Sequence, residues 1–223
     1  MPSRRSLASW SRAAILGLST GIAACDADAG TIRFADERLL IGGDITDEDT
    51  RTLARALRED PHLTTLVFEQ CRGGTLSAAY GFADLIKLRR LQTVASGPCA
   101  SACALAFLAG ARRSFGASSA LNWVALHAAR RPDGSGPSSD ALNRQMLGTL
   151  KTFTSGKLSS ELLQLIAKSW SARSGVFFVR AGGELSSRDG VWYCDGRQGS
   201  DPPHQCKRLP GFDPLSQGIV TEP

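Results

Sequence analysis

The sequence predicts an α/β domain of repeated strand–helix units, with short parallel strands and helices packed around them. Apolar segments typical of strands alternate with segments of helical periodicity along most of the chain. This alternation is typical of sheets whose strands are joined by right-handed crossovers, which makes neighbouring strands parallel. The sequence has neither an internal repeat nor a low-complexity tract, so a single domain accounts for the pattern.

The first two predicted elements are a strand and a helix. Arg38–Ile41 is an apolar run that stops at Gly42-Gly43, a residue pair that commonly ends strands. Thr46 is predicted to cap the following helix, because Asp49 lies three residues further on and completes a capping box. Pro61 cannot continue a helix, so we expect this one to end before it.

The next elements repeat the order of strand, helix and strand. The β-rich run Leu63–Phe68 predicts a buried strand, after which the chain reaches Gly73-Gly74. Helical periodicity then extends from Leu76 to Arg90. Leu91–Ala95 is predicted to be another strand, and we expect Gly97-Pro98 to break it.

The second half of the chain begins with the most apolar segment. Ala100–Ala109 is almost entirely small or apolar, which predicts a helix buried on every side. Ala120–His127 is predicted to be a strand, and helical patterns follow at Asp140–Phe153 and Ser159–Ala172. The last fifty residues are predicted to be irregular apart from a short strand at Val176–Val179.

The N-terminus has the features of a cleavable signal peptide. Arg4, Arg5 and Arg12 form a positive region, and an apolar run from Ala13 to Ala24 follows. That run is too short to cross a bilayer core of about 30 Å as a helix, so no transmembrane helix is expected in the mature chain. We therefore expect export to the periplasm.

Two cleavage sites compete. Ala27-Asp28-Ala29 fits removal of residues 1–29. Alternatively, Ile22-Ala23-Ala24-Cys25 resembles a lipobox, in which case residues 1–24 are removed and Cys25 carries a lipid anchor. In either case we expect residues 30–180 to form the α/β domain and residues 181–223 an irregular, cysteine-containing extension.

The charge distribution argues against a nucleic-acid partner. The net charge is +5, and three of the positive charges lie in the N-terminal segment. The rest of the chain has no basic patch interleaved with aromatic residues, which a nucleic-acid-binding surface would show.

Export places the six cysteines in an oxidising compartment, where disulfides form. Cys194 and Cys206 flank a loop rich in Gly, Pro and Asp, and we expect them to be bridged. Zinc is the alternative there, but the chain has no Cys-x-x-Cys pair and His204 is the only imidazole nearby, so neither a metal nor another cofactor is expected. Cys99 and Cys103 are candidates to pair with each other or with Cys71, and this choice is left open.

Three segments that lie at the carboxyl ends of predicted strands carry groups suited to hydrolysis. Ser101 begins the buried helix, where the next amide, that of Ala102, has no partner within the helix. Gly73 has no side chain, so its N–H can approach a substrate closely and complete an oxyanion hole with Ala102. A serine needs a base, and among the three histidines His127 alone ends an apolar strand at the same edge.

Together these segments resemble the Clp protease proteolytic subunit and the crotonase-type fold, and more narrowly their exported bacterial relatives. The similarity covers roughly Arg38–Arg130 and rests on Gly73-Gly74, the Cys-Ala-Ser101-Ala-Cys turn and Leu126-His127, spaced by 28 residues from Gly73 to Ser101 and by 26 from Ser101 to His127. The resemblance implies that Ser101 is a nucleophile, His127 its base, and Gly73 and Ala102 the oxyanion donors. It also implies a peptide or protein substrate and a homo-oligomer.

The third triad position departs from that family, which places an aspartate after a later strand. Here Arg180 follows the strand at 176–179, and Glu184 and Asp189 are the nearby acidic residues. The main hypothesis is therefore a periplasmic serine hydrolase that acts on peptides. The alternative is a catalytically inactive relative that serves as a binding or scaffold protein. A crotonase-like acyl-thioester enzyme is disfavoured, because coenzyme A is cytoplasmic and no acidic catalytic pair is evident.

Overall fold

The computed structural model describes residues 30–117, 121–131, 133–171, 173–182, 187–196 and 206–222. The predicted signal peptide (residues 1–29), the candidate lipid anchor Cys25, the candidate acid Glu184 and His204 lie outside these described residues.

The described part of the chain forms one nine-stranded sheet and one two-stranded sheet. In the large sheet the order is β1-β2-β4-β6-β8-β9-β10-β11, and β7 pairs with β6 beside β8. The strands of this sheet are β1 Thr31–Ala35, β2 Arg38–Gly42, β4 Thr65–Cys71, β6 Gln92–Ala100, β7 Arg113–Phe115, β8 Leu121–Leu126, β9 Ser174–Ala181, β10 Gly190–Asp195 and β11 Lys207–Arg208. The small sheet pairs β3 Asp44–Ile45 with β5 Gly73–Gly74.

The architecture is α/β, as the sequence predicts, but the sheet is mixed. Strands β2, β4, β6 and β8 are parallel, whereas β1, β9, β10 and β11 join it antiparallel. The prediction of an irregular C-terminal part was wrong, because β10 and β11 extend the sheet beyond β9. The sequence prediction overlooked the β-rich run Val191–Cys194 of β10, and β11 is a two-residue strand that pairs with β10.

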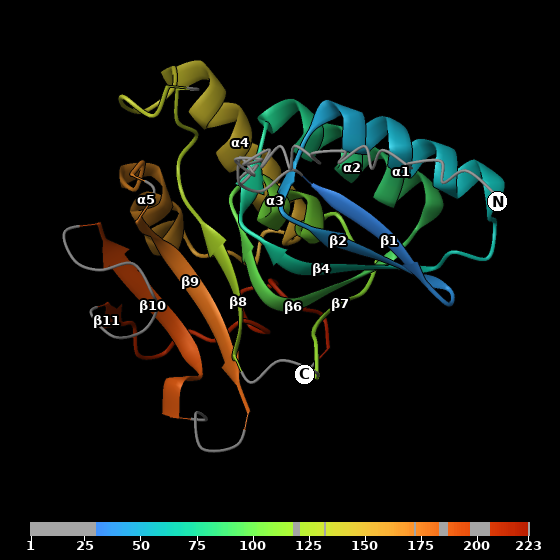
Figure 1. Ribbon diagram of the computed structural model, residues 1–223. Coiled ribbons are helices and arrows are strands. Elements are labelled where there is room, and N and C mark those ends of the chain that lie inside the picture. Colours follow the sequence, from blue (N-terminus) through green and yellow to red (C-terminus); the bar gives the residue numbers. More distant parts are fainter. Residues whose placement is uncertain are drawn as a thin grey trace, which may run out of the picture.

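Five helices are present in the described residues. They are α1 Asp47–Glu59, α2 Leu76–Arg89, α3 Ala102–Leu108, α4 Asp140–Phe153 and α5 Ser160–Lys168. Thr46 and Asp49 form the predicted capping box, and α1 ends before Pro61 as expected. Figure 1 shows α1, α2 and α4 above strands β2, β4 and β6, with α3 between them and the sheet.

Helix α3 lies at the centre of the core. All seven of its residues are buried, which confirms the prediction of a helix enclosed on every side. Phe107 packs edge-on against Phe68 of β4, and α3 also contacts α2 and β6. The helix begins two residues later than predicted, because β6 runs on to Ala100.

Gly97-Pro98 bends strand β6 instead of breaking it, so the sequence prediction was wrong here. Before the bend β6 pairs with β7 over Thr93–Ala95, and after it with β8 over Pro98–Ala100. The Gly97 N–H donates to the side-chain oxygen of Asn122 at 2.7 Å, and Asn122 donates to the Gly116 carbonyl at 2.8 Å. A buried amide side chain thus replaces the backbone partner that the bend removes.

The buried side chain of Arg113 joins the C-terminal residues Gly218 and Ile219 to Gly110, which follows α3. Arg113 donates to the carbonyls of Gly110, Gly218 and Ile219 at 2.8–2.9 Å, and its side chain is 7% exposed. Burial lowers the pKa of Arg113 from its ordinary value, and backbone carbonyls take the place of the lost water. By contrast, the neighbouring Arg112 is exposed and pairs with Glu222.

We expect Arg113→Met to lower the free energy of unfolding by about 3 kcal/mol, because it leaves several buried carbonyls without a donor. Arg112→Met is the matched control and should change stability little, since exposed ion pairs contribute little. Urea unfolding of the two variants and the wild type measures both effects. Equal losses in the two variants would contradict the role assigned to Arg113.

Candidate functional site

Ser101 and His127 line one cavity of about 550 Å³. The carboxyl ends of β6 and β8 bring them there, because these strands are parallel neighbours and each residue directly follows its strand. Ala102 and Gly74 also line the cavity. The sequence predicts that these residues lie at one edge of the sheet. In the structure they border the same cavity.

Ser101 has a backbone conformation that is rare outside glycine. Its φ of 56° and ψ of −122° turn the chain from β6 into α3 within one residue. Its N–H donates to the Ala125 carbonyl and its carbonyl accepts from Leu105, both at 3.0 Å. The side chain makes no capping hydrogen bond to α3, so capping does not explain a serine here. A strained, uncapped serine at a strand-to-helix turn resembles the backbone arrangement of a nucleophile elbow.

His127 is held by its own neighbour in the chain. Its Nδ1 lies 2.8 Å from the Ala128 carbonyl oxygen, so Nδ1 carries the proton and donates, and Nε2 is left as the acceptor. Asn143 of α4 accepts from the Ala129 N–H at 2.8 Å and thereby fixes the segment that follows His127. The ring therefore has the tautomer that a base toward a hydroxyl requires.

The pKa of His127 is lowered from its ordinary value of 6.5. Burial is the largest cause, and the positive charge of Arg130 acts in the same direction, whereas the hydrogen bond to Ala128 opposes them. Because the folded-state pKa lies below 6.5, the imidazole is neutral at neutral pH and becomes protonated only as the pH falls further.

The acidic partner expected after a later strand is not at this histidine in the described residues. Asp189 accepts from the Ala181 N–H, and Ala181 pairs with Leu121 at the opposite end of β8 from His127. Since β9 is antiparallel to β8, Asp189 at the end of β9 lies away from His127. Asp133 does line the cavity, but its carboxylate accepts from the Ser135 N–H at 2.9 Å.

The two glycines of β5 differ in their surroundings. Gly73 is buried, and a Cβ built on it would lie 3.7 Å from that of Ser101. Gly74 is exposed and lines the cavity. The Thr75 N–H donates to Ile45 of β3 at 3.1 Å, and successive N–H groups of a strand point to opposite sides. The N–H of Gly73 is thus directed toward β3, and that of Gly74 away from it.

The cavity wall is mostly apolar and also includes basic residues. The large apolar side chains that line it are Leu76, Leu105, Leu126, Leu142, Met146 and Leu150. Arg130 and Arg131 also line it, and both are exposed. The sequence prediction did not identify Arg130, Arg131 or Asp133 as residues of this cavity. The closeness of all three to His127 in the chain was the available signal.

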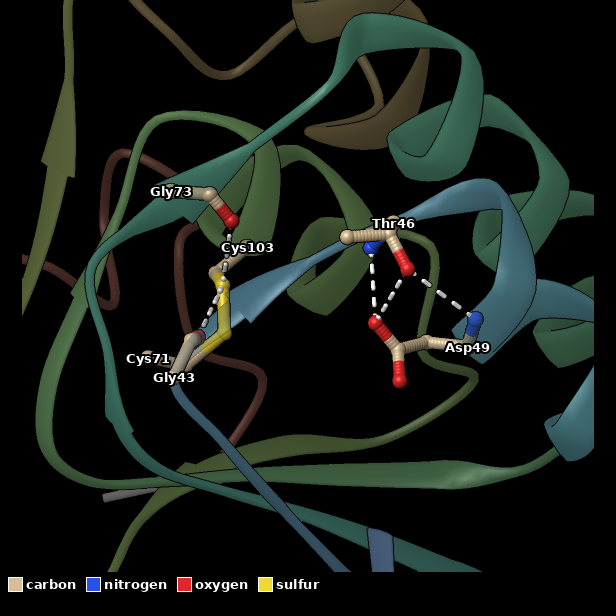
Figure 2. The surroundings of a disulfide bond; sticks show 6 residues. All are labelled: Gly43, Thr46, Asp49, Cys71, Gly73 and Cys103. Carbon is tan, nitrogen blue, oxygen red and sulfur yellow. Dashed lines mark hydrogen bonds between the residues drawn. A yellow bond between two sulfur atoms is a disulfide. The ribbon is translucent and has the colours of Figure 1, made fainter. Parts of the chain in front are cut away.

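The cysteines next to the site are paired in one of the ways that the sequence left open. Cys71 of β4 is bonded to Cys103 of α3, and Cys99 is a buried free thiol. Figure 2 shows this bond, with the carbonyls of Gly43 and Gly73 beside the sulfur of Cys103. At the other end of the chain Cys194 is bonded to Cys206, the pair that the sequence predicts.

Among the residues that the structure describes, no cluster of three or more His, Cys, Asp or Glu side chains is arranged to hold a metal ion. No helix in the same residues is long and apolar enough to span a membrane.

The electrostatic surroundings of His127 predict a specific response to nearby charge. We expect Arg130→Ala to raise the His127 pKa toward its ordinary value, because a positive charge that disfavours the imidazolium is removed. Arg131→Ala is the control and should leave the pKa unchanged. NMR titration of the imidazole ¹⁵N signals measures the shift, with the His127→Gln spectrum assigning the resonances. A lower pKa in the Arg130 variant would contradict this electrostatic account.

No family model matches the chain, and no curated protein matches it. Several solved structures are similar. ClpP1 from Listeria monocytogenes is 16% identical with a TM-score of 0.49, over 83% of this chain and 89% of that one. A mutant of the 1510-N membrane-bound stomatin-specific protease is 13% identical with a TM-score of 0.44, over 57% of this chain and 66%, slightly less than two thirds, of that one.

An enoyl-CoA hydratase/isomerase from Marinobacter aquaeolei is 10% identical, with a TM-score of 0.39 over 62% of each chain. Structures of the ClpP and crotonase kinds are thus among those to which this chain is similar, in agreement with the resemblance noted in the sequence. At these identities the similarity concerns the fold alone.

Proposed function

We propose that this protein is an exported serine hydrolase that cleaves peptide bonds, with Ser101 as nucleophile and His127 as general base. The observation that carries the proposal is the backbone of Ser101, which is held at a positive φ without capping α3, on the wall of the cavity that His127 also lines. Strain at a residue is retained where the surrounding structure enforces it, and such residues cluster at active sites.

The reaction would proceed through an acyl-enzyme. His127 Nε2 accepts the proton of Ser101 Oγ as the oxygen attacks the substrate carbonyl. The negative charge that develops on the carbonyl oxygen is stabilised by the backbone N–H of Ala102 and by an N–H of the Gly73-Gly74 pair. Gly74 is the better placed of the two glycines, since it lines the cavity. The imidazolium then protonates the leaving amine, and water releases the acyl group by the same steps in reverse.

The proposed periplasmic location has separate support. The N-terminal sequence has the features of a signal peptide, and the described residues contain two disulfides, which persist in oxidising compartments. N-terminal sequencing of the mature protein distinguishes cleavage before Gly30 from cleavage before Cys25, and a mature chain that still begins at Met1 would contradict export.

A fluorophosphonate probe should label the wild-type protein at Ser101, because such probes require a serine activated by a base. Ser101→Ala should abolish labelling, and His127→Ala should slow it by roughly 10²- to 10⁴-fold. Ser138→Ala is the matched control, since Ser138 also lines the cavity and has no role in the proposed reaction. In-gel fluorescence and intact-mass measurement detect the adduct.

Labelling that persists in Ser101→Ala, or is equally lost in Ser138→Ala, would count against the nucleophile assignment. If the wild-type protein is not labelled but still binds peptides, the alternative of an inactive binding protein is favoured. Circular dichroism of each variant shows whether a loss of labelling follows from a loss of folding.

The apolar wall of the cavity predicts which bonds are cleaved. Burying an apolar substrate side chain against leucines and a methionine contributes about 25 cal/mol per Å² of buried area, so we expect cleavage next to Leu, Met or Phe. Digestion of a mixed peptide library, analysed by mass spectrometry, gives the profile, and the Ser101→Ala protein controls for contaminating proteases. A profile dominated by charged residues at the scissile bond would show that this cavity does not bind the substrate side chain.

A further inference from the structure

We propose that the Cys71–Cys103 disulfide is a positioning element of the active site, which holds the two oxyanion-donating segments at a fixed separation. The inference rests on the proposed function, because it concerns how that site is assembled. Its test includes a measurement that does not depend on activity.

The disulfide joins the two segments directly. Cys71 ends β4 and lies two residues before Gly73, and Cys103 is the residue after Ala102. The Cα atoms of the two cysteines are 6.0 Å apart, and both residues are completely buried. One covalent bond therefore links the end of β4, two residues before the Gly73-Gly74 segment, to the helix whose first residue carries the other amide.

Apart from the disulfide, the glycine segment is held by backbone pairing with β3 and by contact with α3. Strand β5 consists of Gly73 and Gly74 alone, and it pairs with the two residues of β3. Glycines have no side chains to pack, and their backbone is the most flexible of any residue. The strand that precedes them is also irregular, because the pairing of β4 with β6 shifts between Glu69 and Cys71 and Gln70 has a φ of 51°. A covalent anchor at Cys71 limits the movement that these features allow.

The contact of Cys103 with Gly73 depends on its oxidation state. Its sulfur lies 3.1 Å from the Gly73 carbonyl oxygen. A disulfide sulfur has no proton, so in the bridged protein this is a close contact and not a hydrogen bond. A free Cys103 thiol would have a proton to donate at this position. Loss of the bridge with retention of Cys103 therefore leaves a weaker attachment, whereas loss of Cys103 removes both.

Cys99 is a neighbour of Cys71 and is therefore an alternative disulfide partner for it. It is the Cα partner of Cys71 across β4 and β6. Burial raises the pKa of the Cys99 thiol, which lowers the fraction of thiolate, the species that attacks a disulfide. This disfavours exchange of the Cys71–Cys103 pairing for one with Cys99.

The second disulfide provides a matched control. Cys194 and Cys206 are separated by 12 residues and hold β10 near β11, and neither lines the cavity. Removing either disulfide should lower stability, because each restricts the unfolded chain. Only the loss of Cys71–Cys103 should alter the position of the proposed oxyanion donors.

The test compares Cys71→Ala/Cys103→Ala, Cys194→Ala/Cys206→Ala and the wild type at a temperature where all three are folded. For the first variant we expect kcat for a peptide substrate to fall about 10²-fold with KM unchanged, as when an oxyanion donor is displaced. The second should keep its kcat. The single variant Cys71→Ala, which retains the Cys103 thiol, should lose less than Cys103→Ala.

Hydrogen exchange measured by mass spectrometry supplies the readout that is independent of activity. Exchange at residues 72–76 and 101–104 should rise in the Cys71/Cys103 variant and not in the control pair. If that variant does not fold, the Cys194→Ala/Cys206→Ala protein reduced under native conditions replaces it in both measurements, because Cys71–Cys103 is the one described disulfide that it retains, and the same protein without reductant is the control.

The possible outcomes are distinct. A kcat that falls no more than in the control pair, or a rise in KM alone, overturns the positioning role. If the wild-type protein has no activity, the proposed function fails, and hydrogen exchange alone decides: selective loosening of these two segments supports the inference, and unchanged exchange overturns it.

Discussion

The course of strand β6 determines where Ser101 lies. On one side β6 pairs with β4 as far as Cys99, and on the other it passes from β7 to β8 at the bend in Gly97-Pro98. The side chain of Asn122 satisfies the Gly97 N–H at that bend, which lets one strand serve two partners without leaving a buried donor unpaired. At the end of β6 the chain therefore leaves the sheet at Ser101, between β4 and β8. Strand β4 leads to the Gly73-Gly74 segment, and strand β8 leads to His127.

The turn at Ser101 is costly by itself and depends on the helix that follows. A non-glycine residue in such a conformation costs of order 1–3 kcal/mol. Helix α3 offsets this cost, because burying a single Leu or Phe side chain contributes about 1.5–3 kcal/mol, and Leu105, Phe107 and Leu108 are all nearly inaccessible to solvent. The apolar residues of α3, from which the sequence predicts a fully buried helix, thus also hold Ser101 in place.

The sequence was sufficient where local chemistry determines structure. The capping box at Thr46 and the apolar run of α3 identify their elements without tertiary information. It was insufficient where a distant partner decides, as at Gly97, whose bend is stabilised by Asn122 twenty-five residues later. The two-residue strand β11 likewise has no apolar pattern of its own and is defined by its pairing with β10.

The candidate site shows the same division. Because Ser101 and His127 each follow a predicted strand, the sequence places both at one edge of the sheet. In the structure both line the same cavity. The choice among three cysteines depends on how β4 approaches α3, which no local pattern encodes. Asp189, one of the two acidic residues that follow β9 in the sequence, is not near His127 for a topological reason, because β9 runs antiparallel to β8 and Asp189 binds Ala181, the last residue of β9.

The carbonyl of Ala128 gives His127 an orientation without a counter-charge. In the proposed reaction, a carboxylate in that place would both fix the tautomer and stabilise the imidazolium formed when Ser101 gives up its proton. A neutral carbonyl supplies only the first of these effects, and burial and Arg130 both disfavour the charged ring. Under the proposed mechanism, the imidazole is therefore neutral before the proton transfer, and the charge that it acquires is poorly compensated. A larger share of the proposed catalytic effect then has to come from the oxyanion donors and from substrate positioning, which makes the geometry of the Gly73-Gly74 and Ala102 amides the more important constraint on the proposal.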